Sequence, residues 1–499
     1  MKTFFYHLSL LESRITAHFS QEKYLHPERF SYPHEFAHLS FAKPHDYGLF
    51  LGMNQFDRII QITGTPKRQS LGNVLHIVPS QGGKSTGFKR QLEHWKGSAI
   101  VNDIKGELSR DTARIRRGFS DVYFIDLTGC GDNFNPVQGK TDEHELYAMA
   151  NLLLHQRRED GNGIAFTEQA TEMLTLLFQV ANRAGFPQFL FVSQIVRLGL
   201  NRAAKQIHEI APDLAIQLLD GEYTPDKNYT DNKYLANSWE LLKSRMYPLL
   251  TEAVVKTLTG SSFKIADLLT GKRPVTIYLH WPERYLSALK PLMKLFWGTF
   301  VDELKTIYND LTRYALRADL HRILFLIDEG GVTHVPELHD HVSTVNGYGM
   351  SFVMGIQSIS QLDSYGKSNA ETILNNCSKV FSWQESLETA EYLSRMLGGK
   401  SGFSSSHTSY GSEGKQEQKI PLLSPQEIMG MSEEKRLIFH RGLRYAIQAK
   451  RISFTPPKLL SLPARSQIPV LPGFPVKSSH TFISRHSFTP IELFSSASG

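Results

Sequence analysis

The sequence predicts an α/β fold in which helices cover a parallel sheet and an all-α domain is inserted. Three observations predict this class. From residue 73 onward, short apolar runs alternate with segments of helical periodicity, a helical block interrupts this alternation, and a Gly-rich turn follows the first apolar run. At 499 residues the chain is long for a single core, and 41% hydrophobic residues against 21% charged ones is ordinary for a globular protein.

The strand candidates are short apolar runs, as expected for parallel strands buried on both faces. They are Asn73–Val78, Ser98–Asn102, Val122–Asp126, Val275–His280, Arg322–Ile327, Ser351–Ile356 and Lys379–Trp383. Leu437–His440 and Tyr445–Ser453 are expected to close the sheet. Between these two groups, residues 401–418 are polar and Ser-rich, which favours a loop.

These elements predict four regions. Residues 1–70 form an N-terminal extension, and residues 71–141 together with 266–455 form the α/β domain. Residues 142–265 form the inserted all-α domain, because apolar residues recur there at helical spacing. Its helix candidates are Glu143–His155, Glu168–Arg183, Ser193–Leu200 and Asn232–Thr259. Residues 456–499 are Pro- and Ser-rich and are expected to be a disordered tail.

Composition and charge narrow the function classes. Cys130 and Cys377 are the two cysteines, which excludes a disulfide framework and a cysteine-based zinc site and fits a reducing compartment. The net charge of +6 and the isoelectric point near 9.0 lean towards acidic partners such as nucleic acid. No run of 18 apolar residues occurs, so a cytoplasmic or peripheral location is expected.

The turn after the first apolar run has the layout of a phosphate-binding P-loop. Its candidate nucleotide-binding residues are Ser80, Gln81, Gly82, Gly83, Lys84, Ser85 and Thr86. Backbone N–H groups of such a turn and of the following helix converge on an anion. Lys84 is then placed to reach the β- and γ-phosphates of ATP, and Ser85 to bind Mg²⁺. Val78 stands where the first Gly of the motif is expected, and an ordinary lysine-containing turn is the alternative interpretation.

A second half of a nucleotide site follows the strand candidate Arg322–Ile327. Ligands sit beyond the carboxyl ends of parallel strands, so Asp328 is expected to hold Mg²⁺ with Ser85, and Glu329 to polarise an attacking water. Gln357 ends the next strand and is the candidate sensor of the γ-phosphate. Lys84, Glu329 and Gln357 are thus the predicted catalytic residues. A strand followed by acidic turn residues is the structural alternative.

Further motifs occur in a fixed order along the chain. They are KGEL at 105–108, FNP at 134–136, QSISQL at 357–362, YGK at 365–367, NNC at 375–377 and ETAEYLS at 388–394. In this order the chain, over roughly residues 51–454, resembles the TraG/TraD-type coupling proteins of conjugative type IV secretion systems. The resemblance implies a RecA-like P-loop ATPase with an inserted all-α domain that assembles as a hexamer.

The resemblance also implies a function. Members recruit a relaxase–DNA complex at the bacterial inner membrane and help to move it into the secretion channel. The expected partners are therefore the relaxase or relaxosome, single-stranded DNA and the channel proteins. The expected function is an ATP-dependent coupling protein for DNA or protein cargo. The alternatives are a nucleotide-binding receptor or adaptor with little or no hydrolysis, and a DNA-packaging or segregation motor of the same class.

Three departures from the family pattern bear on this function. The usual N-terminal transmembrane helices are missing, which predicts a protein peripheral to the inner membrane that relies on a separate membrane-anchor protein. Gln81 replaces a Gly of the P-loop. Asn346 stands where the family commonly has an Arg before Gly-Tyr-Gly. If that Arg acts on a phosphate bound to a neighbouring subunit, its loss slows ATP hydrolysis. Another arginine, such as Arg395, is a candidate substitute.

Two other patterns have competing interpretations. His34-Glu35-Phe36-Ala37-His38 matches the H-E-x-x-H zinc pattern, with His45 as a third ligand, provided that a helix places both histidines on one face. A surface turn is the alternative. The basic clusters at 95–96, 114–117 and 435–436 are either solvated faces or DNA contacts.

Overall fold

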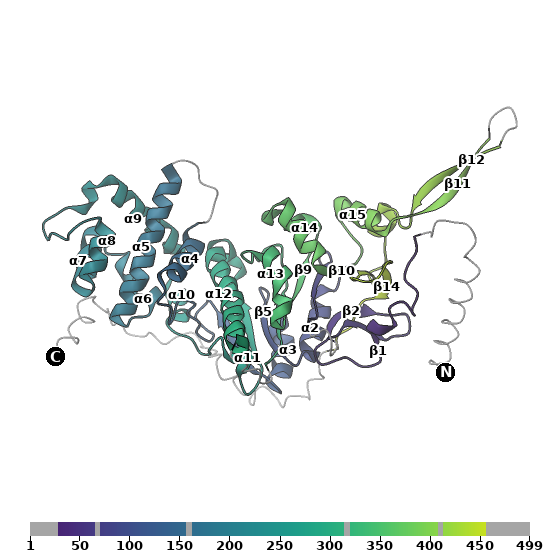
Figure 1. The fold of residues 1–499 in the computed structure, drawn as a ribbon, viewed down its shortest axis with the longest axis horizontal. Coiled ribbons are helices and arrows are strands. Elements are labelled where there is room, and N and C mark those ends of the chain that lie inside the picture. The colour runs from purple at the N-terminus through teal and green to yellow at the C-terminus, as the bar shows by residue number, and fades with distance from the viewer. Residues whose placement is uncertain (1–27, 65–69, 156–161, 314–319, 408–412, 456–499) are drawn as a thin grey trace, which may run out of the picture. The chain divides into compact units, whose positions relative to one another are not determined.

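The computed structural model describes residues 28–64, 70–155, 162–313, 320–407 and 413–455 (Figure 1). The chain divides into two compact units. The first takes its described residues from 1–122, 265–279 and 301–457, and the second from 123–264 and 280–300. The α/β class with helical insertion that the sequence predicts is confirmed.

The first unit is built on one large sheet. Its strand order is β1-β3-β2-β14-β13-β10-β4-β9-β8-β5-β7, and β6, whose first two residues belong to this unit, follows β7. The seven predicted strands are present as β4 (Asn73–Ile77), β5 (Ser98–Asn102), β6 (Asp121–Asp126), β7 (Val275–His280), β8 (Ile323–Ile327), β9 (Met350–Ile356) and β10 (Cys377–Phe381).

The strands from β10 to β7 pair in parallel and form the centre of the core. All residues of β5, β8 and β9 are buried, which explains why these segments read as continuous apolar runs. Ile77 is level with Phe381 and Ile356, and Asn102 is level with Ile327. The carboxyl ends of neighbouring strands therefore meet at one edge of the sheet.

The N-terminal segment contributes three strands that the sequence did not reveal. They are β1 (Ser40–Phe41), β2 (Leu49–Met53) and β3 (Ile59–Ile62). Asn54 organises the turn between β2 and β3, because its side-chain oxygen accepts hydrogen bonds from the backbone N–H groups of Phe56 and Arg58. β2 pairs with β14, so the purple and yellow ends of the described chain lie side by side (Figure 1).

Two hairpins follow β10 in the chain. β13 (Lys435–Phe439) and β14 (Ile447–Lys450) are the predicted closing strands, and β13 runs antiparallel to β10. The polar segment expected as a loop instead forms β11 (Gly399–His407) and β12 (Glu413–Pro421), a two-stranded sheet of its own. Antiparallel backbone pairing from Gly399↔Pro421 to His407↔Glu413 forms this ribbon, and such pairing needs no apolar face, which is why the expectation of a loop was wrong.

Helices flank the sheet of the first unit. They are α2 (Lys84–His94), α3 (Glu107–Arg117), α11 (Asp267–Thr270), α13 (Leu338–Thr344), α14 (Lys367–Asn375), α15 (Leu387–Leu397) and α16 (Pro425–Met429). α12 (Leu286–Arg313) begins in the second unit and ends in the first. Short 3₁₀ segments are η1 (Ala37–Leu39), η5 (Val345–Tyr348) and η6 (Ile359–Tyr365).

The second unit is mainly helical. Its elements are α4 (Glu143–Leu154), α5 (Asn162–Ala184), α6 (Gln188–Ile195), α7 (Leu200–Ile210), α8 (Pro212–Leu219), η2 (Tyr229–Asp231), α9 (Lys233–Met246), η3 (Tyr247–Leu249), α10 (Glu252–Thr257) and η4 (Glu283–Tyr285). The prediction of one helix across Ser193–Leu200 is wrong, because α6 ends and α7 begins within this segment. Gly199, immediately before α7, has φ of 78°, a conformation that favours glycine.

Aromatic packing organises the part of this unit next to its sheet strand. Phe134 stacks on Phe263 and Phe300, with ring centroids 5.3 and 4.7 Å apart. Phe296 meets the Phe134 ring edge-on, with ring centroids 5.0 Å apart.

No helix among the described residues is long and apolar enough to cross a membrane.

Candidate nucleotide site

The turn between β4 and α2 is shaped by two glycines. Gly83, the residue before α2, has φ of 83°, in the left-handed region. A side chain on Gly82 would place its Cβ 2.6 Å from Val78 Cγ1, so this position has no room for one. Gln81 also has a positive φ of 64°, which a non-glycine residue adopts at a cost of roughly 1 kcal/mol. The turn thus keeps the tight form of a phosphate-binding loop although Gln81 replaces a glycine.

Lys84 opens α2 and lies between two carboxylates. Its Nζ is 3.7 Å from Asp328 Oδ1 and 3.7 Å from Glu329 Oε2. Gly355 on β9 makes room for the lysine, because a Cβ there would lie 2.4 Å from Lys84 Cδ and 2.9 Å from Phe88 Cζ. The strand order places β4 and β8 on either side of β9, which explains how residues 244 positions apart meet.

Asp328 and Ser85 connect the same two strand ends a second time. Ser85 Oγ donates a hydrogen bond of 3.4 Å to Asp328 Oδ2. Among the described atoms, Asp328 Oδ1 is buried and accepts no hydrogen bond. Burial raises the pKa of Asp328 to about 6, although the charge of Lys84 lowers it. A buried carboxylate oxygen without a donor, beside a hydroxyl, fits the oxygen donor set of Mg²⁺.

Glu329 is held in its ionised form. Burial works against its charge, but Lys84 and a 3.1 Å hydrogen bond from Lys105 Nζ outweigh burial, so the pKa of Glu329 is lowered. Gln357 Nε2 donates to Glu329 Oε2 at 3.3 Å. Glu329 has φ of 66°, which turns the chain sharply after β8. An ionised, oriented carboxylate at a strand end can accept a proton from water.

Gln357 is itself positioned by a neighbouring glutamine. Gln361 Oε1 accepts a 2.9 Å hydrogen bond from the backbone N–H of Gln357. Gly331 leaves room for this glutamine, because a Cβ there would lie 2.3 Å from Gln361 Cδ. The loop after β8 and the loop after β9 are therefore packed against each other at the site.

Arg436 on β13 supports the P-loop from the closing strands. It is 4% exposed and donates to the backbone oxygens of Glu433, Lys435 and Gly82. Burial, with a smaller contribution from Arg451, lowers the pKa of Arg436 to about 10, so the guanidinium stays charged at neutral pH. Because a carbonyl is the acceptor, Arg436 holds the loop rather than an anion.

The structure brings Lys84, Ser85, Asp328, Glu329 and Gln357 together at the carboxyl edge of the sheet. Of the other predicted binding residues, Ser80 and Gln81 are exposed on the turn and Thr86 lies in the first turn of α2. Asn346 lies in η5, and Arg395, the candidate substitute for the family Arg, lies on α15 with its side chain exposed. The structure does not bring these last two residues into the cluster of five.

Sequence reasoning did not single out Lys105, Gly355 or Arg436 as parts of this site. Lys105 follows β5, and its position could have been inferred from the rule that adjacent parallel strands end together. Gly355 could have been noticed as a glycine inside an apolar strand, which often marks close approach of another group. Arg436 carries no local signal, because its partner Gly82 is 354 positions away.

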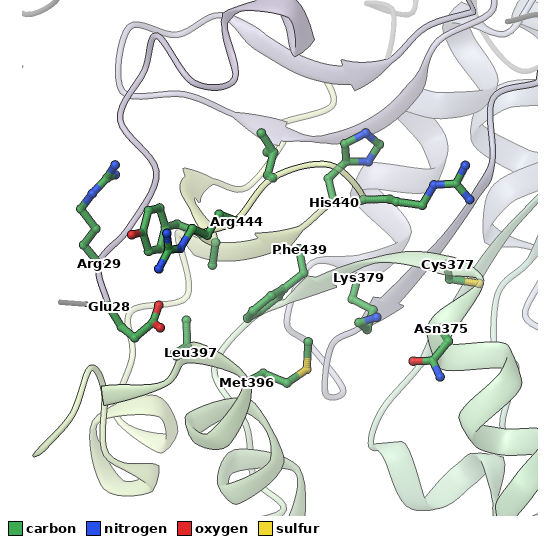
Figure 2. A pocket seen from close by; sticks show the side chains of 14 residues that line it. Glu28, Arg29, Asn375, Cys377, Lys379, Met396, Leu397, Phe439, His440 and Arg444 are labelled. Atoms are coloured by element: carbon green, nitrogen blue, oxygen red, sulfur yellow. The ribbon is translucent and has the colours of Figure 1, made fainter. Parts of the chain in front are cut away.

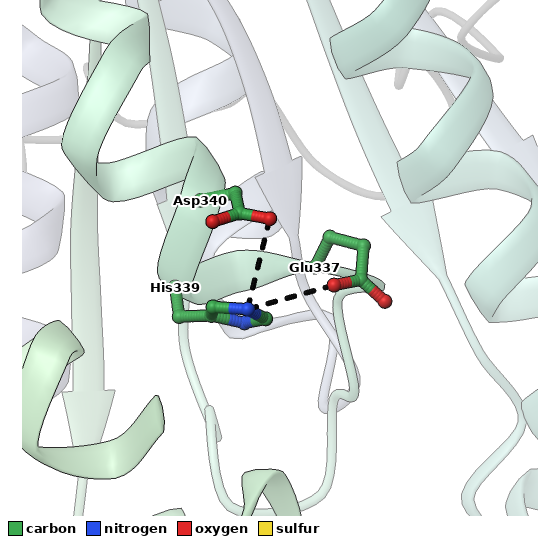
Figure 3. Close-up of side chains that lie close together, drawn as sticks. All are labelled: Glu337, His339 and Asp340. Carbon is green, nitrogen blue, oxygen red and sulfur yellow. Dashed lines mark ion pairs between the residues drawn. The ribbon is translucent and has the colours of Figure 1, made fainter. Parts of the chain in front are cut away.

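The zinc pattern does not assemble. Residues 33–36 form a turn and η1 follows, so no α-helix places His34 and His38 on one face. Glu35 pairs instead with Arg29 at 2.7 Å. Among the described residues, Glu337, His339 and Asp340 at the start of α13 lie close enough together to hold a metal ion. The His339 imidazole lies 3.6 Å from each of the two carboxylates (Figure 3). Both carboxylates are exposed, and exposed acidic groups of this kind commonly hold no ion.

Two arginines of the basic clusters, Arg116 and Arg436, are buried and structural. Arg116 is fully buried and donates to the backbone oxygens of Leu92, Trp95 and Gly97. It therefore ties the end of α2 to α3. Trp95 is buried and, like Arg436, faces inward. Of the two interpretations of these clusters, solvated faces or DNA contacts, neither fits the buried Trp95, Arg116 and Arg436.

Fold and site together define a RecA-like P-loop protein with a helical insertion. The chain belongs to the type IV secretory system conjugative DNA transfer family, whose model matches residues 61–461. The resemblance to TraG/TraD-type coupling proteins is therefore confirmed.

Two curated relatives match most of this chain. The chain is 23% identical to the protein VirD4 of Rhizobium radiobacter over 435 residues, which is 80% of this chain and 59% of the relative. It is 24% identical to the conjugal transfer protein TraG of Escherichia coli over 400 residues, which is 73% of this chain and 62% of the relative. The chain thus spans about three fifths of the length of these relatives.

Solved structures of the bacterial conjugative coupling protein TrwB share the fold. The form with ADP and Mg²⁺ superposes with a TM-score of 0.62 at 15% identity, covering 87% of this chain and 95% of that one. The form with the ATP analogue ADPNP gives 0.60 at 16% identity with the same coverage.

Proposed function

We propose that this protein is an ATP-dependent coupling protein that recruits a relaxase–DNA complex, or a protein substrate, and drives its transfer into a type IV secretion channel. Family membership and the VirD4 and TraG relatives support the class. One observation carries the nucleotide function. Lys84 lies within 3.7 Å of both Asp328 and Glu329, so the cation of a P-loop and the acidic pair of the neighbouring strand end face one another.

The residues of the site fit ATP and Mg²⁺. The backbone of residues 80–83 would surround the phosphates, with Thr86 behind them in α2, and Lys84 would leave its carboxylate partners to reach the β- and γ-phosphates. Ser85 and Asp328 would hold Mg²⁺, which supplies neutralisation of phosphate charge when bound. Asp328 must be ionised for this role, and its raised pKa of about 6 leaves it mainly ionised at pH 7.

Glu329 and Gln357 supply the groups for hydrolysis. Glu329 orients a water molecule and accepts its proton as the water oxygen bonds to the γ-phosphorus and the bond to the β-phosphate oxygen breaks. Gln357, which is hydrogen-bonded to Glu329, would respond to the γ-phosphate. Lys105 keeps Glu329 ionised and therefore able to act as a base.

The wider assembly follows from the same class. We propose a homo-hexamer that works with single-stranded DNA, the relaxosome and the channel proteins, and that is bound at the inner membrane through a separate anchor protein. The names of TrwB, a conjugative coupling protein, and of TraG, a conjugal transfer protein, support the conjugative setting of these partners.

A receptor with little or no hydrolysis is the second candidate function. Gln81 in a strained backbone conformation and Asn346 in place of the family Arg favour it. A receptor would bind nucleotide through the same P-loop without rapid turnover. A packaging or segregation motor shares the nucleotide site and differs in its partners.

Steady-state ATP hydrolysis, measured with and without single-stranded DNA, tests the proposal. We expect Lys84→Ala to abolish turnover and nucleotide binding. Glu329→Gln, which keeps the shape of the side chain, is expected to lower turnover by about 10²–10⁴-fold while binding is retained. Wild-type turnover equal to that of Lys84→Ala would overturn the motor, and retained wild-type nucleotide binding would then establish the receptor.

A further inference from the structure

A cavity lies at the other end of the strands that carry the P-loop. Its volume is about 250 Å³, and its walls come from the amino end of β10, the turn between β13 and β14, the end of α15 and residues 28–29 (Figure 2). We call it the amino-end pocket. In the register of the sheet, Cys377 is level with Asn73, the first residue of β4, whereas the P-loop follows Ile77. The two sites are thus separated by a strand length, roughly 13 Å.

The walls of the amino-end pocket are strongly cationic. Lys379 comes from β10, Arg441 and Arg444 from the turn after β13, and Arg29 from the N-terminal segment. Glu28 is the one carboxylate in the lining. Its side chain rests against Gly398, where a Cβ would lie 2.7 Å from Glu28 Cγ. The lining therefore has four cationic side chains and one carboxylate.

The positive charge of this lining is not balanced within the described part of the chain. Arg29 pairs with Glu35 at 2.7 Å, but Lys379, Arg441 and Arg444 form no ion pair with a described carboxylate. Lys379 donates one hydrogen bond of 2.8 Å, to the backbone oxygen of Leu374, which leaves two of its three donors. Burial lowers the pKa of Lys379, as expected for a cation without a counter-ion.

The local fold holds these cations in place. Lys379 is the cross-strand partner of Phe439, and both side chains line the pocket together with Met396 (Figure 2). The guanidinium carbon of Arg29 lies 4.2 Å from the centroid of Tyr445, and that of Arg444 lies 5.2 Å from it. Tyr445 is buried, so its ring is a fixed platform for two guanidinium groups. A cationic cavity on a rigid scaffold is suited to a multiply charged anion.

We propose that the amino-end pocket binds a phosphate group, carried by a nucleic-acid backbone or by a free nucleotide. Planar guanidinium groups match phosphate oxygens in pairs, and a lysine adds a point charge. About 250 Å³ holds a phosphate with its sugar but is smaller than the roughly 300–1,000 Å³ of sites for larger ligands. The exposed arginines at the mouth allow a chain of phosphates to continue outward.

Arg441→Gln with Arg444→Gln tests the proposal without disturbing the core, because both side chains are exposed. Arg202→Gln with Arg284→Gln is the matched control, with the same change in charge on exposed arginines. All titrations use the full chain in a Lys84→Ala background, which removes the P-loop contribution whether or not the proposed function is correct. The probes are inorganic phosphate, dTMP and a fluorescent eight-residue dT oligonucleotide.

We expect the pocket variant to weaken oligonucleotide binding by about tenfold and the control to bind as the parent does. The slope of log affinity against log salt concentration is expected to fall by about 0.7 for each phosphate that is no longer neutralised. Weakening confined to phosphate and dTMP would also support the pocket and identify a free nucleotide as the ligand. A Lys379→Met variant is expected to reproduce the effect from inside the cavity. Unchanged binding of all three probes by the pocket variant would overturn the proposal. A glutamate-rich peptide with the same charge as the oligonucleotide is the control ligand, and if the pocket variant weakens its binding equally, the proposal is also overturned.

Discussion

The two ends of the strands β4 and β10 differ in how their charges are balanced. At the carboxyl end, Lys84 and Lys105 alternate with Asp328 and Glu329, so two cations meet two carboxylates. At the amino end, the pocket around Lys379 has four cations and one carboxylate. The first cluster is internally paired before any ligand arrives, whereas Lys379, Arg441 and Arg444 in the second form no ion pair with a described carboxylate. An anion that binds at the carboxyl end replaces the carboxylate partners of the lysines, whereas an anion that binds at the amino end supplies a counter-ion that the pocket lacks.

Among the substitutions that test this comparison, the largest expected effect comes from filling the space that Lys84 occupies. Gly355→Ala would place a Cβ 2.4 Å from Lys84 Cδ and 2.9 Å from the buried ring of Phe88, which has no room to retreat. We expect the displaced lysine to weaken ATP binding by about 30–100-fold, the value of a charged hydrogen bond. Equilibrium nucleotide titration measures it.

Gly260→Ala is the matched control for this substitution, because a Cβ at Gly260 meets nothing within 4 Å. Oligonucleotide binding at the amino-end pocket is expected to be unchanged in Gly355→Ala. Nucleotide affinity equal to that of the control would show that the close approach of β9 and α2 does not position Lys84.

Acidification is expected to change the stability contributed by groups at the two ends of the strands in opposite directions. The pKa of Asp328 is raised to about 6 by burial, so its stabilising contribution is present below its ordinary pKa and is lost as the pH rises through 6. Burial, then His38 and Arg441, lowers the pKa of His440 to about 4, so its contribution is present above 6.5 and is lost as the pH falls towards 4. Between pH 7 and pH 5 each change amounts to roughly 1–2 kcal/mol.

Denaturant unfolding of the nucleotide-free protein measures this contrast. Relative to Asp328→Asn, the wild type is expected to gain stability on acidification from pH 7 to pH 5, and relative to His440→Asn it is expected to lose stability. If the stability difference between wild type and variant changes with pH in the same direction for Asp328→Asn and for His440→Asn, the buried environments assigned to Asp328 and His440 are contradicted.

The smallest expected effect concerns the link between the closing strands and the P-loop. Arg436→Lys keeps the charge but cannot reach the oxygens of Gly82, Glu433 and Lys435 together, because a lysine lacks the planar fork. We expect nucleotide affinity to fall by about tenfold, with a loss of stability of about 1 kcal/mol. Lys435→Met, an exposed neighbour on the same strand, is the control. Equal affinities in these two variants would make Arg436 a part of the core without influence on the loop.

Particular residues show what could be predicted from the sequence. β8 is a run of five buried apolar residues that ends at Asp328-Glu329, so its strand character and the place of its acidic pair follow from local pattern and the rule for parallel strands. β2 and β3 escaped notice although their residues are mainly apolar, because their role depends on pairing with β14 at the far end of the chain. The ribbon β11–β12 escaped notice because backbone pairing leaves no hydrophobic pattern.

The sequence by itself determined the class of this protein and the inventory of its nucleotide site. Gly83-Lys84-Ser85, Asp328-Glu329 and Gln357 each follow a recognisable strand, and hydrophobic periodicity is a local property that the chain displays without folding. Only the tertiary structure decided which partners these residues meet. Lys105 on Glu329, Gly355 under Lys84, Arg436 on Gly82 and the cations of the amino-end pocket are brought together by strand order. Contacts between distant segments depend on that order, and no local pattern encodes it.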